Sequence, residues 1–151
     1  MSGSKKLHVR NFEIVSANGT FIDMLIHACK SKIHRATVTQ ADLNYVGSIT
    51  IDEDLLDAAG IKPFQYLNIT NVSNAAFWRT YAMAGKRGNG DICLNGPPAR
   101  LFAPGDKIII LAEVLIEPSE FDALDPVVVF VDDNNKVTEV KNHSTVPHPL
   151  K

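Results

Sequence analysis

The sequence predicts a single domain that is mainly β, and three observations support this fold class. Short runs rich in valine, isoleucine and threonine recur along the chain, as expected for strands. Glycine, proline, asparagine and aspartate separate these runs at the close spacing typical of a small barrel or sandwich. Helical patterns are restricted to two short pieces, and 151 residues are enough for one hydrophobic core.

The N-terminal part divides into an extension and a first strand region. Residues 1–23 are predicted to be an extension with one weak alternating stretch, LHVRNFEI, that would add a strand. Residues 24–40 have the Val, Ile and Thr content of strands and begin the main domain, which we expect to cover residues 24–140. Residues 141–151 are polar, contain proline and are predicted to form a loose tail.

Residues 51–60, IDEDLLDAAG, predict a short helix. An acid near Asp52 can cap its N-terminus, acidic residues fill its first turn, and Gly60 ends it. The remaining apolar runs predict further strands, and the last run has the pattern of a hairpin. These runs are residues 66–72, 77–84, 91–94, 107–116 and 126–140.

The composition argues against several classes of protein. The net charge is −2, so there is no basic excess to neutralise the phosphates of a nucleic acid. The longest apolar run contains Glu113 and is too short to span a membrane, and we expect no signal peptide. Cys29 and Cys93 have no zinc-binding spacing, so we expect no metal site and two buried free thiols in a cytoplasmic protein.

Gly47-Ser48, within NYVGSITID, is the candidate for chemistry. The dipeptide alone favours a simple turn, and the nucleophile elbow of hydrolases is absent because Val46 stands where its first glycine belongs. Another chemistry is open to a Gly-Ser bond. The serine hydroxyl attacks the preceding carbonyl, elimination cuts the chain, and the new terminus hydrolyses to a pyruvoyl group. Glycine favours this attack because it has no Cβ and tolerates unusual backbone angles.

The residues around this bond match a known pattern. Residues 31–61, SKIHRATVTQADLNYVGSITIDEDLLDAAGI, contain Lys32, the pair His34-Arg35 and the motif ADLNYVGS. Further motifs follow downstream in order: TYA at 80–82, RG at 87–88, NG at 95–96 and PGD at 104–106. Together these motifs resemble the aspartate 1-decarboxylase family, which is pyruvoyl-dependent, from about residue 24 to residue 132.

The resemblance implies a fold, a cofactor and an assembly. The fold would be a double-psi β-barrel, and the protein would be a homotetramer with active sites between neighbouring subunits. Cleavage between Gly47 and Ser48 would convert Ser48 into the pyruvoyl group, which forms a Schiff base with an amino-acid substrate. The reaction would convert L-aspartate to β-alanine and carbon dioxide for pantothenate synthesis in the cytoplasm.

The resemblance also assigns roles to residues that have ordinary structural explanations as well. Tyr81 would be the proton donor, although it is equally a half-buried strand tyrosine. Thr80 would point to the opposite face of a regular strand and assist cleavage by stabilising the developing oxyanion. Lys32 would line the pocket, or else be a surface lysine. The other matching substrate-site positions are Tyr45, Asn95, Gly96, Pro97 and Pro98.

Two departures from the family pattern bear on the substrate. The family usually has a carboxylate-binding arginine at the position of Phe77, and Arg79 is a candidate replacement two residues later on the same strand face. The family typically has alanines where Pro97 and Pro98 stand, and proline has no N–H to donate.

Two alternatives to aspartate decarboxylation therefore remain open. One keeps the chemistry for a less acidic or apolar amino acid, and the other is a barrel that binds a ligand without catalysis. The intact Gly47-Ser48, Thr80 and Tyr81 argue against the second alternative. The sequence leaves open whether cleavage needs a helper protein and what residues 1–23 do.

Overall fold

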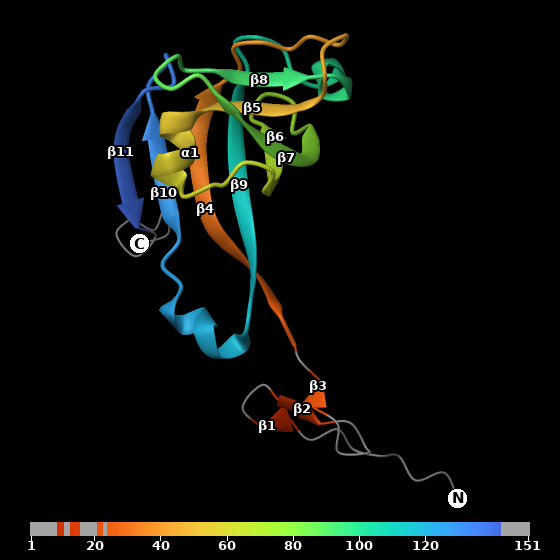
Figure 1. Cartoon of the computed structure of the whole chain (residues 1–151), viewed down its shortest axis with the longest axis vertical. Helices are drawn as coiled ribbons and strands as arrows, with labels where there is room; N and C mark the ends of the chain where they lie inside the picture. The colour runs from red at the N-terminus through yellow and green to blue at the C-terminus, as the bar shows by residue number, and fades with distance from the viewer. Residues whose placement is uncertain (1–8, 11–12, 16–20, 23, 143–151) are drawn as a thin grey trace, which may run out of the picture. The chain divides into compact units, whose positions relative to one another are not determined.

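The computed structural model describes residues 9–10, 13–15, 21–22 and 24–142 (Figure 1). The chain divides into two compact units. Unit 1 comprises residues 1–28 and 114–124, and unit 2 comprises residues 29–113 and 125–151. Every residue of the main hydrophobic core belongs to unit 2.

Unit 1 contains a small antiparallel sheet and a 3₁₀ helix. Its strands are β1 (Val9–Arg10), β2 (Glu13–Val15) and β3 (Phe21–Ile22), in the order β1-β2-β3. The alternating stretch that predicted one added strand therefore contributes to two strands, with Arg10 paired to Glu13. The 3₁₀ helix η2 (Pro118–Ala123) starts with proline and a capping box in which Glu117 and Glu120 are reciprocal partners.

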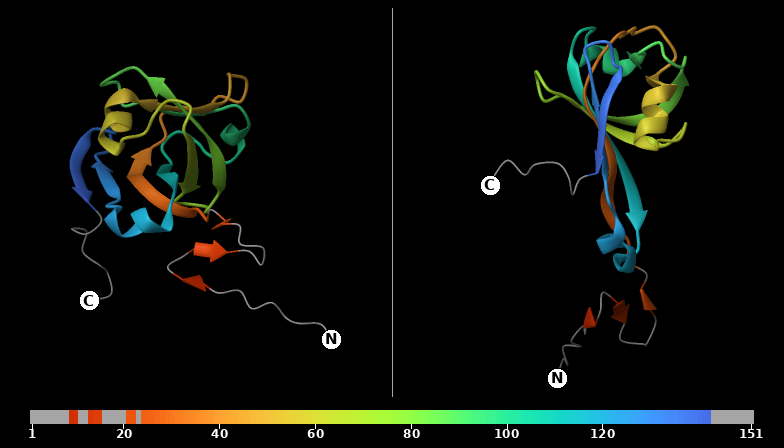
Figure 2. Two further views of the ribbon diagram at one scale, coloured as in Figure 1. Left: turned by 60° about the horizontal axis from the view of Figure 1, so that its bottom comes forward. Right: turned by 90° about the vertical axis from the view of Figure 1, so that its left-hand side faces the viewer.

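Eight strands form the mixed sheet centred on unit 2 (Figure 2). Their order in the sheet is β11-β10-β4-β9-β6-β7-β5-β8. The strands are β4 (Ile26–Thr37), β5 (Ser48–Asp52), β6 (Tyr66–Asn71), β7 (Phe77–Gly85), β8 (Ile92–Asn95), β9 (Lys107–Ile116), β10 (Val127–Val131) and β11 (Val137–Asn142).

The chain just beyond β4 closes this sheet on itself. The Thr39 N–H donates to the Ile92 carbonyl at 2.8 Å, and the Leu94 N–H donates to the Gln40 carbonyl at 2.9 Å. Residues 39–40 therefore pair with β8, the edge strand, while β4 itself lies between β10 and β9. The six strands from β4 to β8 in the sheet order curl into a barrel, as Figure 2 shows, and β10 and β11 extend it as a hairpin. The mainly β barrel predicted for this chain is confirmed.

Alternation of side chains along the strands supplies the core. In β9, for example, Ile108, Ile110 and Ala112 are fully buried while the residues between them are partly exposed. Other fully buried side chains of the core are Ile33, Ile49, Ile51, Leu55, Leu67, Ile69, Ile92, Leu94 and Val129. Burial of each such side chain contributes roughly 1.5–3 kcal/mol, so this interior holds the strand register in which the polar site residues are presented.

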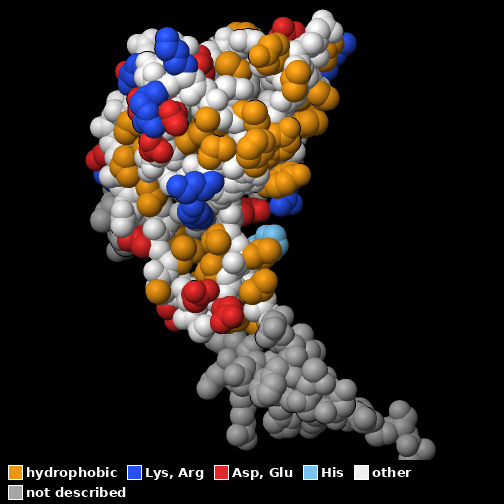
Figure 3. All heavy atoms as spheres, viewed as in Figure 1, with side chains coloured by type: hydrophobic (Ala, Val, Ile, Leu, Met, Phe, Trp, Pro, Cys, Tyr) orange, Lys and Arg blue, Asp and Glu red, His pale blue; other side chains and the backbone are white. Residues whose placement is uncertain are grey.

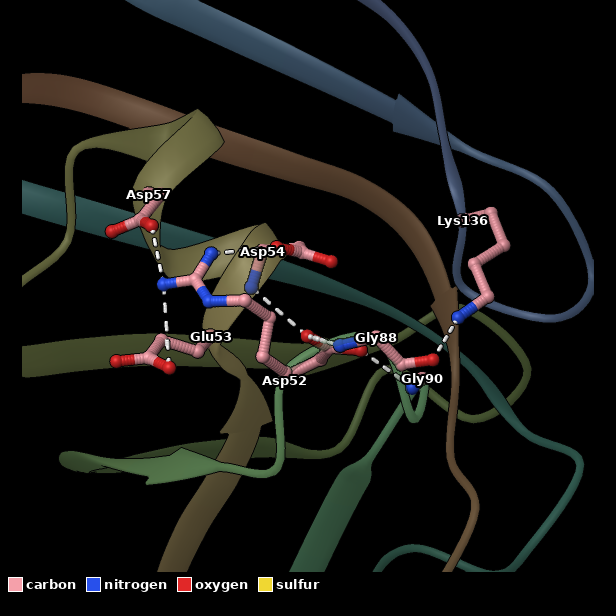
Figure 4. Close-up of polar contacts among 8 residues, drawn as sticks. Asp52, Glu53, Asp54, Asp57, Gly88, Gly90 and Lys136 are labelled. Atoms are coloured by element: carbon pink, nitrogen blue, oxygen red, sulfur yellow. Dashed lines mark hydrogen bonds and ion pairs between the residues drawn. The ribbon is translucent and has the colours of Figure 1, made fainter.

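The predicted helix is α1 (Glu53–Ala59), and its ends are as expected. Asp52 is the N-cap and accepts a hydrogen bond from the Asp54 N–H, while Gly60 adopts the left-handed conformation at the C-terminus. Arg87 bridges the outer face of the helix by ion pairs with Glu53, Asp54 and Asp57 (Figure 4).

Asp52 also holds the loop between β7 and β8. Its carboxylate, which is 1% exposed, accepts hydrogen bonds from the Gly88 N–H at 3.0 Å and the Gly90 N–H at 2.5 Å (Figure 4). Lys136, from the β10–β11 hairpin, donates to the Gly88 carbonyl, and the buried Asn135 amide donates to the Gly90 carbonyl at 2.8 Å. The loop is thereby joined both to α1 and to the hairpin.

Two smaller expectations are corrected. Cys93 is buried as expected, but Cys29 is only half-buried because it lies on the less covered part of β4, and both thiols are free. β11 continues through Lys141 and Asn142, where the tail was expected to begin, and residues 143–151 lie outside the described part of the chain. Within the described residues, no helix is long and apolar enough to cross a membrane.

Candidate functional site

Ser48 is the first residue of β5 and has a strained backbone. Its φ is 93°, in the left-handed region that a non-glycine residue rarely adopts. The residue is 8% exposed, and its hydroxyl donates to the backbone carbonyl of Tyr81 on β7. Positive φ of this kind costs on the order of 1–3 kcal/mol and persists only where surrounding structure enforces it.

Close packing against the Gly47 backbone requires a glycine at position 96. Gly96 has φ 77°, and a Cβ there would lie 3.1 Å from the Cα of Gly47. A Cβ at Gly47 would meet only the Asn95 carbonyl, at an ordinary 3.6 Å. The unusual φ that the sequence led us to expect at Gly47 belongs instead to Ser48, and the tight packing against the Gly47 backbone is provided by Gly96.

Asn95 and Gly96 also hold the chain that leads to Ser48. Asn95 pairs with Ser48 across the antiparallel β5–β8 ladder and is 3% exposed. Its side-chain oxygen accepts the Asp42 N–H at 2.9 Å, and the Gly96 N–H donates to the Asp42 carbonyl at 2.8 Å. Asn95 is thus a structural partner of the loop before Ser48, a role that its turn-like NG motif did not reveal.

Thr80 and Tyr81 lie on opposite faces of β7. Thr80 is buried and alternates with the core residue Ala82, whereas Tyr81 is on the outer, half-exposed face. The Tyr81 ring packs near Tyr66 and Phe64, with centroid distances of 6.3 Å and 6.0 Å. Phe64 was not identified from the sequence as a neighbour of Tyr81. Its backbone φ is 67°.

Arg79 and Phe77 share the outer face of β7 with Tyr81. The Arg79 guanidinium lies over the Tyr66 ring, 5.7 Å from its centroid, which is a cation–π arrangement. Phe77, 58% exposed, pairs with Thr70 at the end of the strand. The face that carries Tyr81 therefore carries a cation, Arg79, which is two residues closer to Tyr81 along the strand than Phe77 is.

The prolines after Gly96 begin the 3₁₀ helix η1 (Pro97–Arg100). Pro98 is buried, Pro97 is exposed, and the Gly96 carbonyl accepts the Ala99 N–H at 3.0 Å. Proline suits this first turn because its fixed φ is helical and its missing N–H would have no helical partner. The two residues thus restrain the backbone next to Gly96.

Lys32 and Tyr45 contribute no side-chain hydrogen bond to this cluster, although the Tyr45 carbonyl oxygen lies 3.7 Å from the position that a Cβ of Gly96 would occupy. Lys32 is half-buried on β4 opposite Val128 and makes no hydrogen bond or ion pair with the described residues. The pKa of His34 is lowered, first by burial of the His34 ring itself and then by the charges of Lys32 and Arg35. Tyr45 is 58% exposed, and its ring makes no aromatic contact within the described part of the chain.

The structure therefore brings together five of the predicted residues, and it adds others. Gly47, Ser48, Asn95, Gly96 and the Tyr81 backbone form one cluster around the glycyl-serine bond. Asp42 was missed because its role depends on hydrogen bonds to β8, although an Asp two residues before Asn44 is a signal for a local turn. Metal-binding clusters of three or more His, Cys, Asp or Glu side chains do not occur among the described residues.

Fold and site together define a closed β-barrel protein with a buried serine held in a strained conformation directly after a glycine. Comparison with known proteins gives a more specific assignment. A family model described as aspartate decarboxylase matches residues 24–138. The chain belongs to this family.

Curated relatives support the same assignment over most of their lengths. The aspartate 1-decarboxylase of Caldicellulosiruptor saccharolyticus is 54% identical over 119 residues, covering 79% of this chain and 93% of the relative. That of Neisseria meningitidis is 53% identical with the same coverage. The Clostridium acetobutylicum enzyme is 50% identical over 126 residues, covering 82% of this chain and 99% of the relative.

Proposed function

We propose that this protein is a self-processing, pyruvoyl-dependent decarboxylase that converts L-aspartate to β-alanine and carbon dioxide in the cytoplasm. Family membership supports the reaction class, and the aspartate 1-decarboxylase relatives support the substrate. The observation that carries the proposal is the backbone of Ser48, which has φ 93° directly after Gly47 and is buried against Tyr81 and Asn95. The positive φ of Ser48 places backbone strain next to the peptide bond that must break, and such strain is a known feature of functional sites.

Cleavage begins with the Ser48 hydroxyl. Its oxygen forms a bond to the Gly47 carbonyl carbon while the peptide C–N bond breaks, which gives an ester and a free Ser48 amine. Loss of the proton on the Ser48 Cα then expels the Gly47 carboxylate and leaves dehydroalanine at position 48. Addition of water and loss of ammonia yield the pyruvoyl group.

The chain's own groups fit this sequence of steps. The Tyr81 carbonyl accepts a hydrogen bond from the Ser48 hydroxyl and so fixes the orientation of the hydroxyl before attack. Thr80, one residue earlier on β7, is buried on the inner face and is our candidate for stabilising the oxyanion that develops on Gly47. Close packing by Gly96 limits the movement of the Gly47 backbone.

The residues also fit the decarboxylation reaction. The pyruvoyl group supplies an electron sink for the electrons released when carbon dioxide leaves. Tyr81 carries a phenolic proton on the outer face of β7 and is our candidate for the group that protonates the substrate carbon after that loss. Arg79 places a cation on the same face, and we propose that it binds a substrate carboxylate in place of an arginine at position 77.

Intact-mass analysis of the purified protein tests the self-cleavage proposal. We expect two fragments, residues 1–47 and residues 48–151, with the larger fragment lacking a free amino terminus and carrying a carbonyl that reacts with hydrazine. Ser48→Ala should remain one chain of 16.5 kDa. A wild-type protein that stays intact after prolonged warming, both alone and with lysate added, would rule out the pyruvoyl proposal.

A further inference from the structure

Asp42 makes four backbone and side-chain hydrogen bonds at the start of the segment that ends at Ser48. Its N–H donates to the Asn95 side-chain oxygen at 2.9 Å, and its carbonyl accepts the Gly96 N–H at 2.8 Å. One carboxylate oxygen accepts the Asn44 N–H at 2.8 Å, which closes a local Asx turn. The Asp42 carbonyl also accepts the Tyr45 N–H at a longer 3.4 Å.

Both ends of this short segment meet the same dipeptide. Asp42 bonds to Asn95 and Gly96, Gly47 packs against Gly96, and Ser48 pairs with Asn95. The residues between these ends are exposed: Leu43 by 39%, Tyr45 by 58% and Val46 by 83%. Burial therefore does little to fix the path of residues 43–46, and the turn at Asp42 is what directs the chain back towards Gly96.

We infer that Asp42 is a positioning residue for self-cleavage, an inference that rests on the function proposed above. Attack requires the Ser48 oxygen and the Gly47 carbonyl carbon to be held roughly 3–3.5 Å apart in the correct orientation. A segment whose first turn is not fixed would sample more paths between its two ends, which would reduce the fraction of molecules in that geometry. The Asp42 carboxylate restricts those paths by fixing the first turn of the segment.

The position of Asp42 allows this role to be separated from a role in folding. The residue is exposed, so removal of its carboxylate leaves neither a cavity nor a buried unpaired group. Its backbone hydrogen bonds to Asn95 and Gly96 remain available after any side-chain substitution except proline. The side chain therefore affects chiefly the turn.

The test compares first-order cleavage rates of purified, uncleaved precursors of Asp42→Ala, Asp42→Asn and wild type. We expect Asp42→Ala to cleave roughly three- to tenfold more slowly, as expected for the loss of one hydrogen bond that orders the reacting segment. Asp42→Asn should restore the rate to within about twofold of wild type, because its side-chain oxygen still accepts the Asn44 N–H. Asp122→Ala, which removes an exposed acid on η2, is the control for loss of one negative charge.

Thermal unfolding in a Ser48→Ala background completes the test, because that background cannot cleave. Addition of Asp42→Ala should leave the melting temperature within the error of the measurement. The inference is overturned by Asp42→Ala cleaving at the wild-type rate, by Asp42→Asn being as slow as Asp42→Ala, or by a large fall in the melting temperature. Absence of cleavage in wild type itself would instead overturn the proposed function.

Discussion

Ser48 shows how one residue can be both a strand residue and a source of strain. It is the first residue of β5 and pairs with Asn95, yet its φ of 93° is one that side chains disfavour. The family resemblance of the sequence made the Gly47-Ser48 dipeptide the point of interest. It could not show that Ser48 has the strained backbone, because the partners that hold Ser48, Tyr81 and Asn95, lie 33 and 47 residues away in the chain.

The opposite facing of Thr80 and Tyr81 predicts separate effects on the two reactions. Thr80→Ala should slow self-cleavage on the order of a hundredfold, the usual cost of one lost oxyanion donor. Tyr81→Phe retains the backbone carbonyl that accepts the Ser48 hydroxyl, so it should cleave and then decarboxylate slowly. Gel densitometry follows the first reaction and β-alanine formation the second. Equal slowing of cleavage by both substitutions would contradict this division.

Arg79 predicts a specific effect on aspartate binding. Arg79→Ala should raise the KM for aspartate about tenfold, the loss expected for a charge-assisted carboxylate contact, with a smaller change in kcat. Arg79→Lys is the matched control, because it keeps the charge but loses the planar donor pair. Phe77→Arg should partly rescue Arg79→Ala if a cation anywhere on this face is sufficient. Faster turnover of an apolar amino acid than of aspartate by the wild type would favour the less acidic substrate class instead.

At the scale of elements, β5 is fixed at both of its ends by polar contacts. Ser48 and Asn95 define one end, and the other is Asp52, which caps α1 and accepts N–H groups from Gly88 and Gly90. The helix, its cap and its terminal glycine were predictable because capping is local in sequence. The contact of Asp52 with the β7–β8 loop could not be predicted, because its partners Gly88 and Gly90 lie 36 and 38 residues away in the sequence.

Asp52 makes a prediction for stability and its dependence on pH. Burial alone would raise its pKa, but the hydrogen bonds from Gly90, Asp54 and Gly88 and the charge of Lys136 hold the pKa below its ordinary value of 3.8. Because the pKa is lower in the folded state, the stabilisation is complete above about pH 4–5 and is lost as the pH falls through the folded-state pKa.

Substitution of Asp52 tests this directly. Asp52→Asn should lose about 1–3 kcal/mol of unfolding free energy at pH 7, because an amide N–H₂ group would oppose one of the backbone N–H donors. Urea unfolding at pH 7 and at pH 3, in a Ser48→Ala background, should show a smaller difference from the parent at pH 3. Asp57→Asn, which alters only an exposed ion pair of Arg87, should change stability by less than about 1 kcal/mol. A difference that stays constant with pH would exclude ionisation of Asp52 as the cause.

At the scale of the molecule, unit 2 exposes an apolar face over β6 and β7. Phe64, Tyr66, Phe77 and Met83 are exposed by 69%, 60%, 58% and 36%, and Figure 3 shows hydrophobic side chains gathered over this part of unit 2. Exposed aromatic clusters of this kind mark association surfaces. Runs rich in valine, isoleucine and threonine predicted the strands, but not that residues 39–40 would close the sheet against β8, since short-range patterns carry no information on such pairings.

This face predicts a homo-oligomer, and we expect a tetramer in agreement with the family resemblance. Native mass spectrometry or light scattering should give about four times the mass of the chain for wild type. Phe64→Glu should shift the population towards smaller species, because a charge would have to be desolvated on association. Phe121→Glu, at an exposed phenylalanine of η2, is the matched control and should have no such effect. A wild-type monomer at micromolar concentration would contradict the prediction.

The place of β4 in the sheet has a consequence for the mature protein. After cleavage, residues 1–47 would contribute β4 and the segment that pairs with β8, while β9, β10 and β8 would belong to the other fragment. The first fragment would thus supply a central strand of the sheet, which backbone hydrogen bonds hold on both sides and core residues such as Ile33 and Val38 hold in the interior. Before cleavage the protein folds as a single chain, but after cleavage the two fragments must associate in order to refold. We therefore expect unfolding of the mature form to depend on protein concentration, and its recovery from denaturant to slow on dilution, as it does for any heterodimer.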